Sequence, residues 1–201
     1  MAALRRYRIL DTREEGSFAR LTEEMAHTFR VPIAAVTFVD ERRQWFKAGY
    51  GLGVRETPRA LSFCAQALER AEPLVVRDAR LDLRFARNPL VCGPLGVRFY
   101  AGARLLDPEG HALGAACIID RRPRPEGLSP VETARLMAFA ERAMAHADLH
   151  LFRLEWLEHL PRAALERAAA ACQRGETGVA NRLVNLAYAA VERREDIFDI
   201  P

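Results

Sequence analysis

The sequence predicts an α+β domain in which helices pack on a mostly antiparallel sheet. Two apolar segments, 97–106 and 111–120, are separated by the turn residues 107–110, and a turn this short joins antiparallel strands. The segments 14–30 and 130–159 instead carry their apolar residues at helical spacing. The full order is helix, two strands, helix, strand, long loop, hairpin and long helix, which favours an α+β architecture.

The first predicted helix begins after Thr12, which can form a capping box with Glu15, and it ends near Arg30. Its apolar face consists of Phe18, Leu21, Met25 and Phe29. The next segment, 33–39, is apolar on both alternating faces, which predicts a central strand covered on both sides. Residues 44–50 are then the returning strand, and residues 51–58 a loop.

A second helix is predicted over 62–70 and a further strand over 73–78. Residues 79–96 form a long irregular stretch, and a connection of this length in a compact domain is usually functional or disordered. The hairpin that follows carries small residues at 101–103 and 114–116. Small residues in strands indicate the close approach of another group, which is either a packed helix or a bound ligand.

The last long helix begins with a capping box of Ser129 and Glu132 with a proline at the first helical position. We expect it to run to about His159, where Pro161 ends it. Along this helix, one row of apolar residues is spaced alternately by three and four positions, which is typical of a helix that packs along its length on a partner helix. The row consists of Met137, Ala140, Met144, Ala147, Leu151 and Leu154. Two shorter helices follow, over 162–173 and 179–194. The predicted domains are 1–145 and a helical extension, 146–201.

The composition is that of a globular protein with nearly balanced charge. The formal net charge is +3, and the basic residues are spread along the chain, so nucleic acid is not an expected partner. The chain has no apolar signal region at its start and no apolar stretch long enough to cross a bilayer. We therefore expect a cytoplasmic protein without a membrane partner, whose four cysteines stay mostly reduced.

An ordered set of short motifs along this chain is similar to a subgroup of bacterial GAF domains, which often precede histidine kinases and diguanylate cyclases. The similarity covers about residues 5–145. It rests on residues 9–12, 31–34, 43–47, 57–59, 62–64, 75–80, 84–86, 88–91, 98–102 and 113–120. Residues 146–201 match no family that we recognise, and they are too few for a kinase or cyclase.

The resemblance implies a twisted antiparallel sheet with helices on both faces. The terminal helices cover one face, while a short helix and long loops enclose a small-molecule pocket on the other. Apolar walls with a few polar groups are typical of such pockets. The residues expected to line it are Phe63, Cys64, Ala67, Asp78, Phe85, Arg98, Phe99, Tyr100 and Cys117. Alternatively, the aromatic residues are core, and Asp78 and Arg98 are an ion pair.

Other chemistries have weaker signals in the sequence. Cys92 lies in a loop rich in Gly and Pro and is the expected exposed thiol, but the active-site pattern of free-methionine sulfoxide reductases is not found. No cysteine precedes a histidine, as a bilin-attachment cysteine commonly does, and the signature of cyclic-nucleotide GAF domains is absent. His146 and His150 are spaced to share a metal, but two ligands make only half a site, so we expect a solvated helix face and no metal. No cofactor can be named.

These observations predict a non-catalytic sensory or regulatory GAF protein that binds a small molecule. It would act in signal transduction as a homodimer through the helix at 130–159, or through contacts with a signalling partner. A ligand-free adaptor that uses its C-terminal helices is the alternative, and a thiol-based redox enzyme is a third hypothesis. Side chains that fill the pocket would favour the adaptor.

Overall fold

The computed structural model describes residues 1–177, 179 and 181–188 of the 201-residue chain. The chain divides into two compact units, Met1–Ala147 and Asp148–Pro201. The first unit contains the sheet, and the second contains helix only in its described part. The assignment of a sensor domain to residues 1–145 and of an extension to 146–201 stays a prediction.

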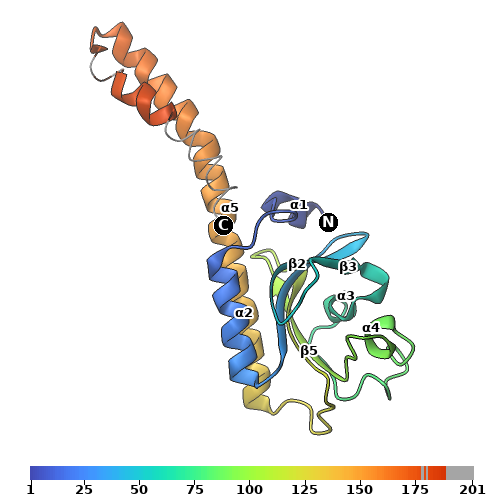
Figure 1. Cartoon of the computed structure of the whole chain (residues 1–201). Helices are drawn as coiled ribbons and strands as arrows, with labels where there is room; N and C mark the ends of the chain where they lie inside the picture. Colours follow the sequence, from blue (N-terminus) through green and yellow to red (C-terminus); the bar gives the residue numbers. More distant parts are fainter. Residues whose placement is uncertain (178, 180, 189–201) are drawn as a thin grey trace. The chain divides into compact units, whose positions relative to one another are not determined.

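The sheet has six antiparallel strands in the order β3-β2-β1-β6-β5-β4 (Figure 1). The strands are β1 (Ile33–Val39), β2 (Arg43–Tyr50), β3 (Glu56–Pro58), β4 (Leu74–Val76), β5 (Phe99–Leu106) and β6 (Ala112–Asp120). Every residue of β1 is buried, because β1 pairs with β2 and β6 and both of its faces are covered. The predicted central strand is therefore confirmed, whereas the short β3 lies in a segment that was predicted as loop.

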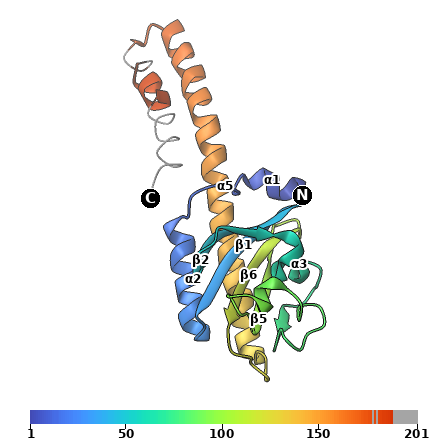
Figure 2. The same cartoon turned by 45° about the vertical axis from the view of Figure 1, so that its right-hand side comes forward.

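Helices cover both faces of this sheet (Figures 1 and 2). One face carries α2 (Gly16–Phe29) beside the first part of α5 (Pro130–Gln173), and the rings of Phe29 and Phe139 lie 6.0 Å apart between these helices. The other face carries α3 (Phe63–Leu68) and the single turn α4 (Pro89–Cys92). The α+β fold with helices on both faces is thus confirmed.

The small residues of the hairpin are explained by neighbouring protein atoms. A Cβ atom on Gly114 would lie 1.8 Å from the carbonyl oxygen of Thr37, so this glycine lets β6 approach β1 closely. A Cβ atom on Gly102 would lie 2.2 Å from the hydroxyl of Tyr100. Gly102 therefore leaves room for the Tyr100 ring, which folds over its own strand.

The start of α2 differs from the prediction. Its N-cap is Glu15, which makes no capping hydrogen bond, and Thr12 instead donates to the Ile9 carbonyl at 2.7 Å. Lys47, the only lysine of the sequence, explains the difference because it draws both side chains away from the helix end. Its buried ammonium donates to Thr12 Oγ1 at 2.7 Å and lies 2.8 Å from the Glu15 carboxylate.

The long helix α5 begins as predicted and ends later than predicted. Ser129 Oγ accepts from the Glu132 amide at 3.2 Å, and the Glu132 carboxylate accepts from the Ser129 amide at 2.8 Å, which completes the capping box. The helix then continues through Pro161 to Gln173, so the predicted stop at His159 is wrong. Alanine has the highest helix propensity of the amino acids, and the sequence after Pro161 is rich in alanine. This propensity offsets the loss of the backbone hydrogen bond that proline cannot donate.

The C-terminal part is described only in part. A turn with Gly175 at φ 74° follows α5, and residues 181–188 are helical, within the predicted helix 179–194. Residues 180 and 189–194 of that prediction lie outside the described residues. A short helix that the sequence did not suggest, α1 (Ala2–Tyr7), begins the chain.

Candidate ligand-binding site

The short helix α3 begins at a capped and well-anchored end. Ser62 is its N-cap and accepts a hydrogen bond from the Ala65 amide at 2.9 Å, while its own hydroxyl donates to the side chain of Gln44 on β2. The helix therefore starts at a fixed point on the sheet. Its first turn places Phe63 and Cys64 over the central strands.

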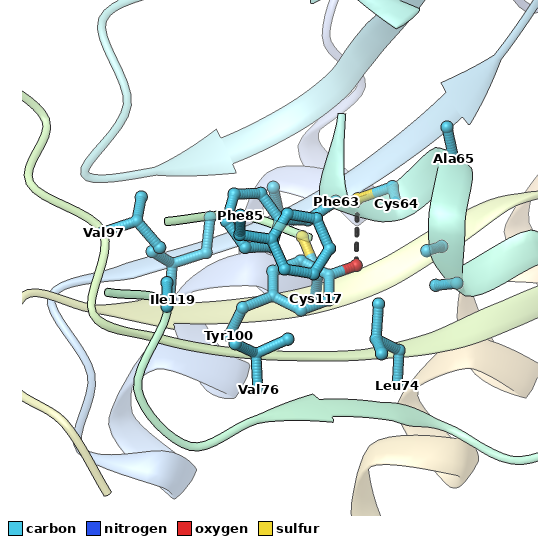
Figure 3. Packing of buried hydrophobic residues seen from close by; sticks show 14 of the residues in the cluster. Phe63, Cys64, Ala65, Leu74, Val76, Phe85, Val97, Tyr100, Cys117 and Ile119 are labelled. Atoms are coloured by element: carbon cyan, nitrogen blue, oxygen red, sulfur yellow. Dashed lines mark hydrogen bonds between the residues drawn. The ribbon is translucent and has the colours of Figure 1, made fainter. Parts of the chain in front are cut away.

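The predicted site residues under α3 form a packed cluster. The rings of Phe63 and Phe85 stack with centroids 4.0 Å apart, and the Tyr100 ring lies 5.1 Å from Phe63 (Figure 3). Ala67 and Cys117 belong to the same buried cluster. Six of the nine predicted residues are therefore brought together, and their own side chains occupy the space where the sequence predicted a ligand pocket: Phe63, Cys64, Ala67, Phe85, Tyr100 and Cys117.

A small polar network lies inside this apolar cluster. The Tyr100 hydroxyl donates to the Cys64 sulfur at 3.2 Å, as the dashed line in Figure 3 shows. Burial raises the pKa of Tyr100 well above its usual value. Burial also acts to raise the pKa of Cys64, but hydrogen bonds with Cys117, Thr37 and Tyr100 outweigh it and lower that pKa. The hydrogen bond with Cys64 and burial both raise the pKa of Cys117.

Asp78 and Arg98 lie at the margin of the cluster and form a two-pronged ion pair. The Arg98 guanidinium donates to the two Asp78 oxygens at 2.8 and 2.6 Å. This hydrogen bonding lowers the pKa of Asp78. A backbone bond of 2.6 Å from the Ala79 amide to the Arg98 carbonyl reinforces the contact. The pair therefore anchors the start of the loop 79–96 to β5.

Phe99 does not lie with the other predicted site residues. Side chains alternate between the two faces of a strand, so Tyr100 faces α3 and Phe99 faces α2 and α5. The guanidinium of Arg124 lies 4.9 Å from the centre of the Phe99 ring. We predicted that both Phe99 and Tyr100 line the pocket because they are adjacent in the motif at 98–102. Consecutive residues of a strand point to opposite faces of the sheet, so only one of them can lie on the α3 face.

Two residues that the prediction omitted help to close the site. Asn88 caps α4 by accepting from the Leu90 amide at 2.9 Å, and its side-chain nitrogen donates to the Leu61 carbonyl, also at 2.9 Å. An Asn before a proline is a helix-capping signal that could have found it. The Thr37 hydroxyl donates a hydrogen bond to the Ala115 carbonyl at 3.2 Å. Thr37 lies within an apolar strand, and nothing in the sequence around it indicated a contact with the site.

The remaining thiols and potential metal ligands have ordinary structural surroundings. Cys92 is exposed, as expected, and its sulfur lies 3.1 Å from the Ala86 carbonyl. His150 is 6% exposed, so the prediction of a solvated face is wrong for this residue. His146 is partly buried and packs on Phe18 with ring centroids 5.5 Å apart. Among the described residues, Asp107, Glu109 and His111 come within metal-binding distance of one another. Asp107 accepts from the His111 amide at 2.7 Å and thereby closes the β5–β6 turn.

The fold and the filled α3 face define a domain of the GAF class. The family model of the GAF domain matches residues 14–146, and the chain belongs to this family. A cyclic di-GMP phosphodiesterase of Pseudomonas aeruginosa is 43% identical over 143 residues, which are 70% of this chain and 24% of that protein. This chain therefore spans about a quarter of the length of that relative.

Solved structures support the fold at low sequence identity. The GAF domain of an Acinetobacter phosphoenolpyruvate-protein phosphotransferase superposes with a TM-score of 0.56 at 17% identity, covering 73% of this chain and 91% of that one. A free methionine-R-sulfoxide reductase from Neisseria meningitidis superposes with a TM-score of 0.53 at 15% identity, covering 71% and 83% of the two chains. A domain of a phosphotransferase and a sulfoxide reductase thus share this fold, so the fold alone assigns no activity.

Proposed function

We propose that this chain is a non-catalytic regulatory module in signal transduction, with the GAF domain as its sensor and α5 as its output element. The observation that carries the proposal is the continuity of α5. Its first part packs on the GAF sheet through the buried Leu136, Phe139 and Ala143, and the same helix continues to Gln173. In this proposal a rearrangement at the sheet would be passed to α5, whose residues belong to both compact units of the chain.

A small-molecule signal would have to open the α3 face. Phe63, Phe85 and Tyr100 occupy that space in this structure, so a ligand could enter only if the Phe63–Phe85 stack separates. Most backbone hydrogen bonds that the loop 79–96 makes join residues within the loop, so this loop, which carries Phe85, can move as a unit while its turns stay intact. The filled site also favours the second candidate, an adaptor that binds no small ligand and works through protein contacts alone.

Native and denaturing mass spectra of the freshly purified chain distinguish these two candidates. A mass excess that disappears on denaturation identifies a bound small molecule and supports the sensor. No excess, together with an unchanged melting temperature when cyclic di-GMP, cyclic GMP or cyclic AMP is added, favours the adaptor. Both outcomes leave the regulatory role standing.

Catalytic activity is the outcome that contradicts the regulatory role. We expect the chain neither to hydrolyse cyclic di-GMP nor to reduce free methionine sulfoxide in the presence of dithiothreitol. Should the second activity be found, the single variants Cys64→Ser, Cys92→Ser and Cys117→Ser decide whether a thiol performs it. Loss of activity in one of them would establish a thiol enzyme.

The output of such a module requires a partner for α5, and we infer that this partner is a second copy. The seam expected to pair two copies is not free, because Ala140, Met144 and Ala147 are each at most 5% exposed within the chain. A different stripe on the same helix is exposed. Leu149, Phe152 and Trp156 are 54, 64 and 54% exposed and follow one another in steps of three and four.

Light scattering after size-exclusion chromatography tests this stripe. We expect a dimer at micromolar concentration for the wild-type chain and a monomer for Phe152→Ser/Trp156→Ser. Leu165→Ser is the matched control, since Leu165 is 50% exposed on α5 but outside the stripe. A wild-type monomer, or a dimer that survives in the double variant, would exclude the stripe as the dimer contact.

A further inference from the structure

Two loops at the end of the sheet opposite α1 form one basic surface, which we call the loop patch. They are residues 77–87, after β4, and residues 121–125, after β6, at the lower end of the domain in Figure 1. The Arg124 amide donates to the Arg77 carbonyl at 2.9 Å and joins the loops. They also share a groove lined by Val75, Leu81 and Pro123. The loop patch is therefore a continuous surface.

The acidic residues of the loop patch are already neutralised. Asp82 pairs with Arg84 at 2.6 Å, Asp78 pairs with Arg98 at 2.6 Å, and Asp120 lies 3.5 Å from Arg124. The other arginines of the two loops are exposed, and in the described part of the chain their guanidinium groups hydrogen-bond to no side chain. These residues are Arg77, Arg80, Arg87, Arg121 and Arg122. The surface that remains is cationic.

Two leucines project from the same surface. Leu81 is 81% exposed and Leu83 is 99% exposed, which are high values for apolar side chains. Turn hydrogen bonds fix the backbone around them: the Leu81 amide donates to the Asp78 carbonyl at 3.0 Å, and the Phe85 amide to the Asp82 carbonyl at 2.9 Å. The buried Phe85 then holds the end of this turn in the core. The leucines are consequently presented to solvent by a fixed loop.

We propose that the loop patch binds the surface of an anionic lipid bilayer. Leu81 and Leu83 enter the boundary between headgroups and acyl chains, and the unpaired arginines contact the phosphate groups around them. A nucleic acid would satisfy the arginines but would offer nothing to two projecting leucines. A bilayer offers phosphate groups to the arginines and an apolar region to the leucines. It also needs no pocket or groove of complementary shape, which suits side chains as exposed as Leu81 and Leu83.

This binding is peripheral and needs no membrane-crossing segment. No helix in the described part of the chain is long and apolar enough to cross a bilayer. The expectation that the protein has no membrane partner rested on that lack alone, and peripheral binding needs no such helix. The proposal is independent of the regulatory role of α5.

Co-sedimentation of the full chain with large unilamellar vesicles tests the proposal. The vesicles are phosphatidylcholine alone, or phosphatidylcholine and phosphatidylglycerol in equal amounts. We expect the partition coefficient to be at least about tenfold higher on the anionic vesicles in 50 mM salt, and to fall at least about tenfold in 500 mM salt, because the arginine contacts are screened. An absence of sedimentation with anionic vesicles would overturn the proposal.

Two double variants separate the apolar and ionic contributions. Leu81→Ser/Leu83→Ser and Arg80→Glu/Arg121→Glu should each lower the partition coefficient at least about tenfold. The matched controls, Val54→Ser and Arg20→Glu/Arg42→Glu, alter exposed residues elsewhere on the domain and should bind like the wild-type chain. All changed side chains are exposed, and circular dichroism verifies folding. If the leucine variant binds like the wild type, the surface recognises anions only, which would point to an acidic macromolecule and overturn the bilayer proposal.

Discussion

The two faces of the GAF sheet are built from alternating residues of the same strands, yet they are covered in different ways. The face under α2 and α5 packs against two long helices with continuous apolar stripes that include Phe18, Met25 and Leu136. The face under α3 is covered by a six-residue helix and the loop 79–96. There, polar contacts such as Tyr100–Cys64 and Arg98–Asp78 supplement the aromatic stack.

This difference indicates which face can respond to a signal. The helices α2 and α5 cannot leave the sheet without exposing a large apolar area. We therefore expect the face under α2 and α5 to behave as a rigid unit. The α3 face is closed by a short helix, a loop and a few hydrogen bonds, and such elements open at lower free energy. The predictions below compare the contributions of the two faces to stability, from the largest expected effect to the smallest.

Removing one buried aromatic ring from each face should give unequal losses. We expect Phe99→Ala, under α2 and α5, to lower the free energy of unfolding by about 3–5 kcal/mol, because the strand and the long helices cannot collapse into the cavity. Phe85→Ala should cost about 3 kcal/mol or less, because the loop that carries Phe85 can rearrange. Urea unfolding followed by circular dichroism measures both losses, and a larger loss for Phe85→Ala would reverse the comparison.

The ion pair that anchors the loop 79–96 should make a pH-dependent contribution. We expect Asp78→Asn to lower stability by about 1–2 kcal/mol at neutral pH, because a charge-assisted bond to Arg98 is weakened. The pKa of Asp78 is lowered in the folded chain, so this contribution is fully present above the ordinary carboxyl value of 3.8 and is lost as the pH falls through the folded value.

Urea unfolding of the wild type and the Asp78→Asn variant between pH 2 and pH 7 checks this dependence. The two stability curves should converge at the acid end. Glu126→Gln, which changes another exposed carboxylate to its amide, is the control for the loss of one negative charge. Parallel curves for wild type and Asp78→Asn would show that the pair adds no pH-dependent stability.

The hydrogen bond inside the α3 cluster should contribute less than the ring that carries it. Tyr100→Phe keeps the ring and removes the hydroxyl that donates to Cys64, so we expect a loss of about 1 kcal/mol. Tyr50→Phe, at a tyrosine that is 38% exposed, should change thermal stability very little. A loss near zero for Tyr100→Phe would mean that apolar packing alone closes this face.

The exposed ion pair between the two long helices should contribute least. Arg142 and Glu24 contact each other at 2.6 Å, but both side chains are 50% exposed. We expect Glu24→Gln to lower stability by less than about 0.5 kcal/mol, because solvent and salt screen the attraction. A double-mutant cycle with Arg142→Gln, measured by urea unfolding, isolates the pair, and a coupling above about 1 kcal/mol would mean that this face also depends on polar contacts.

Local signals in the sequence were sufficient to predict a helix or strand where the hydrophobic pattern is long or where both residues of a capping box are present. The continuous apolar run of residues 33–39, the stripe from Phe18 to Phe29 and the box of Ser129 with Glu132 each predicted the element that the structure contains. Such signals depend on interactions between residues near in sequence. They failed at Thr12 and Glu15, where Lys47, more than thirty residues away, binds the side chains that would have capped the helix.

The sequence by itself determined the α+β class, the covered central strand and the hairpin, because periodicity and turn chemistry are local properties. The six residues that meet under α3 were expected from the resemblance to GAF domains. Only the tertiary structure decided that Phe99 faces away from Tyr100, that Phe63 and Phe85 stack where a pocket was predicted, and that Leu81 and Leu83 are exposed beside exposed arginines. These outcomes depend on which distant side chains converge in space, and one-dimensional spacing does not contain that information.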